Sequence, residues 1–167
     1  MKIIYFFYQL FIALPILLVA TILTCTTIIV GTSIGNAHFW SYWPGKIWSM
    51  LFCYVLLLPV RVKRNPNVRK DTSYVFVANH QGAFDIFMIY GFLGHDFKWL
   101  MKKGIRKIPL IGKASESAGH IFVDKSGPKK IYATIMHARK VLTGGTSLVI
   151  FPEGSRSFTG HMGYFKR

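Results

Sequence analysis

Acidic side chains and cysteines are both scarce in this chain. Its 167 residues include 6 Asp and Glu against 21 Lys and Arg. The two cysteines, Cys25 and Cys53, lie in apolar segments, so the sequence offers no disulfide framework and no cysteine metal site. We expect both thiols to be free and buried. The length is enough for one domain with a sizeable core.

The chain is apolar as well as poor in acidic residues: 51% of its residues are hydrophobic. A basic and apolar chain favours an anionic membrane surface as its partner. Nucleic acid is the alternative, since the 16% of aromatic residues could stack on bases. No basic low-complexity tail, zinc-ligand spacing or RNA-binding signature supports that alternative. We therefore expect a phospholipid membrane and no nucleic acid.

Charge is absent altogether between residues 3 and 45, and residues 3–30 are almost wholly apolar. About 20 apolar residues suffice to span a bilayer. A shorter apolar run, 47–60, fits a re-entrant, interfacial or buried helix. The joining stretch holds Trp40, Tyr42, Trp43 and Trp48, the make-up of an interfacial aromatic belt. A secretory signal peptide is disfavoured, because the run is too long and no A-x-A cleavage site follows it.

Residues 1–60 are thus predicted to be a hydrophobic, membrane-associated helical segment, and residues 61–167 a separate domain. This second part holds 19 of the 21 basic residues, all but Lys2 and Lys46, and the positive-inside tendency puts it on the cytoplasmic face. Here β-rich stretches alternate with helical ones. This alternation predicts an α/β fold with a mainly parallel sheet covered by helices. The expected strands are 73–78, 97–101, 120–124 and 146–151, and the expected helices are 84–93 and 128–143, the latter with Ile131, Ile135, Ala138 and Leu142 as its apolar face.

Polar clusters follow three of these strands, with the sequences NHQGAFD, DKSG and PEGSRS. In a parallel sheet all three lie at the carboxyl ends of the strands, where open α/β sheets bind ligands. His80 and Asp85 can meet if His80 sits in the strand-to-helix turn and Asp85 in the first helical turn. Asp85 would then fix the tautomer of His80 and leave the other ring nitrogen as a base. The alternative is that His80 caps the strand and Asp85 only caps the helix. A G-x-S-x-G match at residues 31–35 ends an apolar helix, so we interpret it as packing or turn residues.

The motifs NHQGAFD, GHIFVDKS and FPEGSRS, in this order and approximate spacing, resemble the glycerolipid acyltransferase family, which includes the lysophosphatidic acid acyltransferases. MKKGIRKIPLIG between the first two motifs and GHMGYFKR at the end extend the resemblance over residues 61–167. It implies that His80 is the general base and that Asp85 orients and charges it. It also implies substrate-binding roles for Lys125, Glu153, Gly154 and Arg156, with Lys102 as a further phosphate contact. At Lys125 the family usually has arginine, and lysine keeps the charge but loses the bidentate fork.

The reaction implied by the resemblance is acyl transfer from acyl-coenzyme A or acyl carrier protein to 1-acylglycerol-3-phosphate, with no metal and no other cofactor. The alternatives are another acceptor, such as a lyso-ornithine lipid, and a non-catalytic lipid-binding relative. The family generally continues past the third motif, so we expect the domain to be incomplete at its C-terminus. An uncovered apolar patch or open sheet edge is then predicted near residues 146–151.

Overall fold

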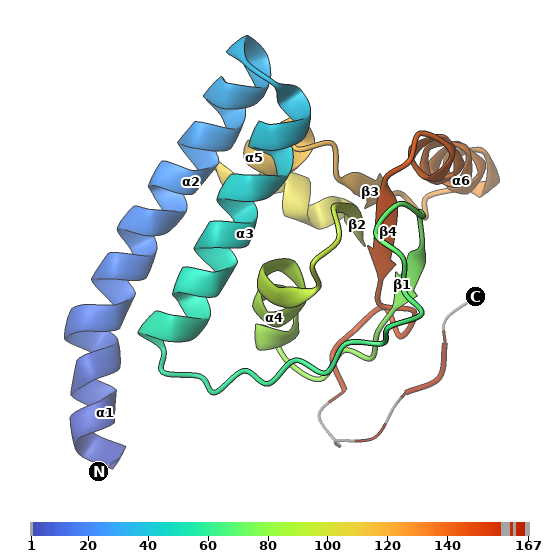
Figure 1. The fold of residues 1–167 in the computed structure, drawn as a ribbon. Helices are drawn as coiled ribbons and strands as arrows, with labels where there is room; N and C mark the ends of the chain where they lie inside the picture. The colour runs from blue at the N-terminus through green and yellow to red at the C-terminus, as the bar shows by residue number, and fades with distance from the viewer. Residues whose placement is uncertain (1, 158–160, 162, 166–167) are drawn as a thin grey trace.

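A hairpin of two long apolar helices precedes the sheet (Figure 1). The computed structural model describes residues 2–157, 161 and 163–165. The first arm of the hairpin consists of α1 (Lys2–Tyr8), a π-helical turn η1 (Gln9–Ala13) and α2 (Leu14–Ile34). Pro15 has no N–H to donate to the preceding turn, and the wider π-helical turn lies directly before it.

By length and composition, this 33-residue arm could cross a membrane. Only 22% of its most apolar stretch is buried within the fold, so most of its apolar surface faces outward. That exposure differs from the core helix of a soluble protein, whose apolar residues are covered. The prediction of an apolar helix in the first 60 residues is therefore confirmed.

The second arm, α3 (Ala37–Val55), contains the aromatic residues that the sequence placed in a linker, and that expectation was wrong. The turn is confined to Gly35 and Asn36, and the Asn36 side chain caps α3 by accepting the N–H of Phe39 at 3.2 Å. The helix continues through Pro44. Several of its aromatic side chains pack inward, because Tyr42 is buried and the Trp48 indole N–H donates to Thr21 at 2.9 Å.

Close packing also explains the glycine at position 31. A Cβ there would lie 2.5 Å from the Trp40 ring, which is closer than any side chain tolerates. Gly31 therefore lets the two arms approach, and Gly35 ends α2. The interpretation of residues 31–35 as packing and turn residues is confirmed. Cys25 and Cys53 are free and buried, as expected.

The sheet has four strands, all parallel, in the order β1-β4-β2-β3. The predicted α/β class is therefore confirmed. Its strands are β1 (Val75–Val77), β2 (Phe97–Lys102), β3 (Ile121–Val123) and β4 (Ser147–Ile150). Because β4 pairs with β1 on one side and β2 on the other, the open edge predicted near residues 146–151 is not β4 itself but its neighbour β1. Apolar exposure lies instead on the edge strand β1, where Val75 is 48% and Val77 55% exposed.

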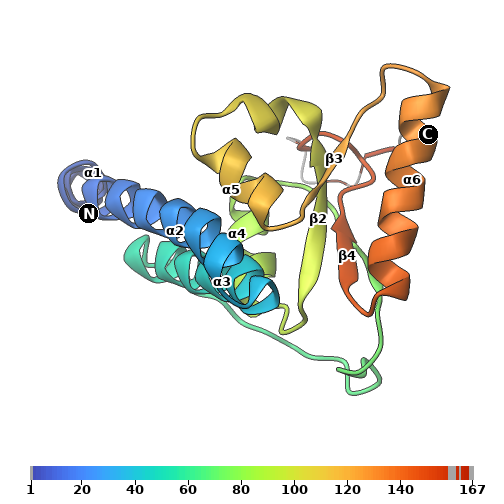
Figure 2. The ribbon, with the colours of Figure 1, turned by 90° about the horizontal axis from the view of Figure 1, so that it is seen from above.

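Helices cover both faces of the sheet (Figure 2). The hairpin and α4 (Phe84–Phe92) lie on one face, and α6 (Pro128–Thr143) lies on the other. The central core joins α3, α4, β2 and β4 through Tyr42, Tyr90, Phe97, Trp99 and Val149. The apolar face predicted for α6 is only partly covered, because Ile131 and Ile135 are 41% and 58% exposed.

Two short helices between β2 and β3 were not predicted. They are a 3-10 helix, η2 (Lys103–Lys107), and α5 (Ile111–Ser117). Ala114 and Ala118, in α5 and directly after it, pack against Cys25 and Ile28 of α2 and so fix the hairpin to the α/β domain.

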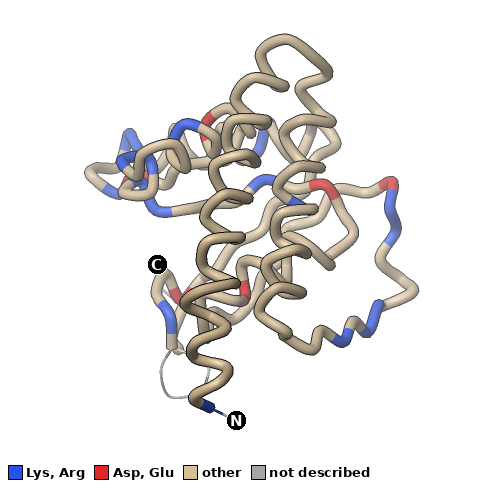
Figure 3. The backbone as a smooth tube through the Cα atoms, turned by 90° about the vertical axis from the view of Figure 1, so that its left-hand side faces the viewer, with Lys and Arg blue, Asp and Glu red and all other residues tan. Residues whose placement is uncertain are grey.

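Charged residues are distributed unevenly between the two parts of the fold. Figure 3 shows few of them on the hairpin and most of the basic ones on the α/β part.

Candidate active site

His80, in the loop after β1, meets Asp85, in the first turn of α4, as the sequence predicted. The Asp85 Oδ2 lies 3.0 Å from the Nδ1 of His80. The same oxygen accepts the backbone N–H groups of Gln81 at 2.7 Å and Gly82 at 2.8 Å. Asp85 therefore braces the loop before α4 and orients the imidazole with a single atom. The alternative that it only caps the helix is wrong, because both N–H groups belong to loop residues that precede α4. Both side chains are mostly buried, with 15% of His80 and 18% of Asp85 exposed.

The segment after β4 contacts His80 at three further points. The Phe151 ring stacks on the imidazole, with the ring centres 4.1 Å apart and the planes 16° from parallel. The Glu153 Oε1 accepts the backbone N–H of His80 at 2.8 Å. The backbone N–H of Ser157 donates to the carbonyl oxygen of His80 at 2.7 Å. The first and third sequence motifs thus form one site, although 73 residues separate His80 from Glu153.

Glu153 is buried, with 4% of its surface exposed, and both of its oxygens are engaged. Oε2 accepts the backbone N–H of Gly163 at 2.8 Å. The hydrogen bonds from the backbone of His80 and Gly163 hold the pKa of Glu153 below its usual value, so this carboxyl is ionised. Gly154 follows at a φ of +67°, a left-handed conformation that glycine adopts without strain and that turns the chain sharply after Glu153.

Three cations predicted to bind substrate lie at or near the carboxyl edge of the sheet. Lys102 ends β2, Lys125 follows β3 by two residues, and Arg156 lies in the loop after β4. All three are exposed, and none has an ion-pair partner among the described residues. Lys103, by contrast, pairs with Asp124 at 2.7 Å. The structure therefore brings Asp85 and Glu153 each into contact with His80 and leaves the three cations available to an anionic ligand.

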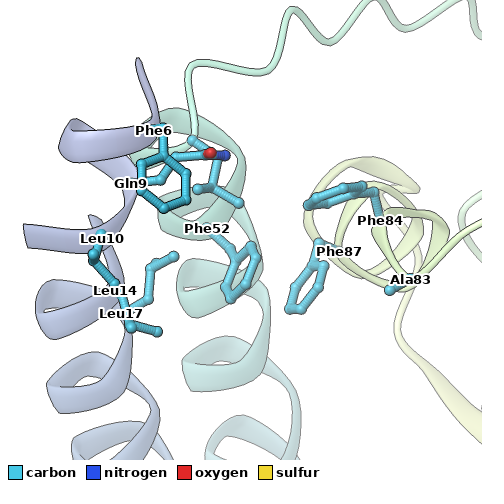
Figure 4. A pocket seen from close by; sticks show the side chains of 10 residues that line it. Phe6, Gln9, Leu10, Leu14, Leu17, Phe52, Ala83, Phe84 and Phe87 are labelled. Atoms are coloured by element: carbon cyan, nitrogen blue, oxygen red, sulfur yellow. The ribbon is translucent and has the colours of Figure 1, made fainter. Parts of the chain in front are cut away.

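An apolar groove of about 520 Å³ borders the start of α4 (Figure 4). Phe84, which begins α4 directly before Asp85, lies on one wall, and the π-helical turn and α2 form the opposite wall. Gln9 is the polar residue of the lining. Residues from both arms of the hairpin and from α4 line it, namely Phe6, Gln9, Leu10, Leu14, Leu17, Phe52, Leu56, Ala83, Phe84 and Phe87. Within the described residues, no group of three or more His, Cys, Asp or Glu side chains could hold a metal ion.

Comparison with protein families decides the relationship of this chain. The family model described as "Acyltransferase" matches residues 59–167, which include the whole sheet and the His80 loop. The chain belongs to the acyltransferase family. The resemblance noted in its motifs is thereby confirmed, and the match begins close to the end of the hydrophobic segment.

Relatives within the acyltransferase family carry more specific names. A chloroplastic 1-acyl-sn-glycerol-3-phosphate acyltransferase, LPAT1 of Arabidopsis thaliana, is 32% identical over 123 residues, which are 73% of this chain and 34% of the relative. The 1-acyl-sn-glycerol-3-phosphate acyltransferase of Helicobacter pylori is 33% identical over 108 residues, or 65% of this chain and 45% of the relative. This chain therefore spans less than half the length of these relatives.

A solved structure supports the fold over almost the whole chain. The crystal structure of the 1-acyl-sn-glycerophosphate acyltransferase PlsC from Thermotoga maritima matches with a TM-score of 0.75 at 24% identity. The match covers 99% of this chain and 66% of that one. The helical hairpin and the α/β part therefore recur together in an acyltransferase structure.

Sequence reasoning missed two of the contacts around His80. Phe151 was interpreted only as the end of a strand, and Ser157 only as a member of the third motif. The motif FPEGSRS contains both residues, but their contacts depend on the pairing of β4 with β1, which a motif does not reveal. The GHMGYFKR end of the resemblance lies partly outside the described residues.

Proposed function

We propose that this acyltransferase transfers a fatty acyl group from a thioester to the free hydroxyl of 1-acylglycerol-3-phosphate, giving phosphatidic acid for phospholipid synthesis. The observation that carries the proposal is the 3.0 Å contact between His80 Nδ1 and Asp85 Oδ2. A proton on Nδ1 faces the carboxylate, and Nε2 remains as the base. The names of the relatives support this acceptor.

The reaction takes place in two steps at His80. As the acceptor oxygen attacks the thioester carbonyl, Nε2 takes the hydroxyl proton and Asp85 stabilises the imidazolium that forms. The C–S bond then breaks, and the leaving sulfur takes the proton from His80. The products are the esterified lipid and the free thiol of coenzyme A or of acyl carrier protein. This balance needs neither a metal nor a redox cofactor.

The surroundings of the pair support a lipid substrate with an anionic head. The groove beside α4 is lined almost entirely by apolar side chains, which suits an acyl chain. Lys102, Lys125 and Arg156 are unpaired within the described residues and could contact a phosphate at or near the carboxyl edge of the sheet. The apolar hairpin would hold this edge at the lipid headgroups, with the basic α/β part on the cytoplasmic face.

The decisive test is acyl transfer by the purified protein in detergent micelles. Radiolabelled oleoyl-coenzyme A or oleoyl-acyl carrier protein would be supplied with 1-oleoylglycerol-3-phosphate, a lyso-ornithine lipid or lysophosphatidylcholine, and the lipids separated afterwards. We expect labelled phosphatidic acid, and none from a folded His80→Ala variant. Labelled ornithine lipid alone would favour the second acceptor, in line with Lys125, whose point charge is less selective for phosphate than the guanidinium of arginine. No labelled lipid from any acceptor would favour a non-catalytic relative.

A further inference from the structure

His80 is held more completely by the segment after β4 than by its own loop. Asp85 fixes one edge of the imidazole, and Phe151 covers a face of the ring at 4.1 Å. The N–H of His80 donates to Glu153, and its carbonyl oxygen accepts from Ser157. Backbone and ring are thus both fixed, and the ring edge that bears Nε2 is the part with no described hydrogen bond.

The surroundings of Glu153 do not suit a ligand for a phosphate lipid. Its side chain is 4% exposed, and each oxygen already accepts a backbone N–H. The carboxyl is ionised, and the Asp85 carboxylate faces the same histidine. A phosphate brought to this place would meet two negative charges, which repel it. The exposed cations at this edge offer the phosphate a better place.

We propose that Glu153 and Phe151 are positioning residues that hold His80 in its catalytic orientation, Glu153 through the backbone N–H and Phe151 through the stacked ring. The inference rests on the proposed function, in which His80 is the base. It replaces the role in acceptor binding that the motif implies for Glu153. Small displacements of a catalytic base are costly, because the reacting atoms must lie about 3–3.5 Å apart in the productive complex.

This proposal predicts a specific pattern in the kinetics of Glu153 variants. Glutamine keeps one acceptor oxygen but presents an NH2 group to one of the two backbone N–H donors, whereas alanine removes both bonds. We expect kcat to fall about tenfold in Glu153→Gln and about 10²-fold or more in Glu153→Ala, in the range of positioning losses. The KM for 1-oleoylglycerol-3-phosphate should change less than twofold in both. Glu116→Gln removes a carboxylate on α5 that pairs with Arg106 and has no described contact with His80, and it is the matched control with unchanged kinetics.

A second measurement follows His80 without any turnover. The chain has six histidines, so selective ¹⁵N-histidine labelling gives a small set of backbone amide signals, among which the His80→Ala variant identifies that of His80. We expect the His80 amide to exchange with deuterium at least tenfold faster in Glu153→Ala than in the wild type or in Glu116→Gln, because its hydrogen bond is lost. This readout holds even if the wild type transfers no acyl group, in which case the proposed function fails by itself.

Phe151→Leu tests the other contact and serves if Glu153→Ala does not fold. The stacked phenyl ring shields the imidazole protons of His80, so their NMR signals should move downfield in this variant while kcat falls and KM stays constant. A rise of tenfold or more in acceptor KM with kcat kept in Glu153→Gln would overturn the proposal and restore a binding role. Unchanged His80 amide exchange in folded Glu153→Ala, or unmoved ring signals in Phe151→Leu, would overturn it as well.

Discussion

Replacing Asp85 by asparagine and by alanine separates charge from geometry at the His–Asp pair. The Asp85 Oδ2 accepts two backbone N–H groups and lies 3.0 Å from His80 Nδ1. The amide oxygen of asparagine can take this position and keep both backbone bonds. Asp85→Asn therefore removes the charge and leaves the loop in place, whereas Asp85→Ala removes both.

The size of the effect follows from the distance. Two unit charges 3.0 Å apart attract by about 5.5 kcal/mol at an effective dielectric constant of about 20. The amide oxygen keeps roughly half of this attraction, so stabilisation of the imidazolium falls by about 3 kcal/mol, or ~10² in kcat at 1.36 kcal/mol per tenfold. Asp85→Ala also leaves two backbone N–H groups without their acceptor, which costs about 2 kcal/mol of folding stability and ~4–8 °C in Tm.

The assay is initial-rate acyl transfer to 1-oleoylglycerol-3-phosphate, with Tm measured by differential scanning fluorimetry on the same samples. We expect Asp85→Asn to melt within about 2 °C of the wild type and to lose most of its turnover. Wild-type turnover in a folded Asp85→Asn protein would refute the electrostatic role. Wild-type Tm and turnover in Asp85→Asn, with losses of both in Asp85→Ala, would show that Asp85 only caps the loop.

Three further perturbations test the rest of the site. His80→Ala should lower kcat by ~10²–10⁴ with little change in Tm, and near-normal turnover would contradict its role as the base. Lys125→Ala should raise the KM for a phosphate-bearing lysolipid more than it lowers kcat, and equal effects on phosphate-free lysolipids would remove the assignment. Burial and the neighbouring Lys98 lower the pKa of His120 to about 3, below its unfolded value, so its contribution to stability is complete above about pH 6.5 and is lost as the pH falls toward 3. Wild-type Tm should therefore drop more between pH 7 and 4.5 than that of His120→Asn, whose Oδ1 can still accept the Trp99 N–H, and parallel profiles would exclude this effect.

The sequence predicted the parts of the fold whose signals are local. Alternating β-rich and helical stretches were enough to predict a parallel sheet, because each strand and helix carries its own pattern. The strand order was not predictable, since pairing between β1 and β4 joins residues 73 positions apart. Helix α5 escaped notice because it has seven residues and is held by contacts with α2 rather than by its own periodicity.

The residues of the candidate site were likewise predictable where their signals are local and not where they depend on tertiary contacts. His80, Asp85 and Glu153 were predicted because their motifs are short and ordered along the chain. The Phe151 stack was not, because an aromatic residue at the end of a strand is more often core. The aromatic residues around Trp40 and Trp43 were assigned to the stretch that joins two apolar runs, yet they lie in α3, which continues through Pro44 and Gly45. Packing against α2 and α4 outweighs the local cost of proline there.

The central place of β4 in the sheet has a consequence for biosynthesis. During translation β1 emerges first, but its partner in the described part of the sheet is β4, which appears about seventy residues later. At ~5–20 residues per second, β1 and the His80 loop wait several seconds without a partner. Through that interval the nascent chain exposes a hydrophobic hairpin and an unpaired strand, both of which invite aggregation. Early capture of the hairpin by a lipid bilayer would shield the larger of these surfaces, and the histidine would gain its alignment only when β4 inserts between β1 and β2. Assembly of the sheet and acquisition of catalytic competence would then be a single late event.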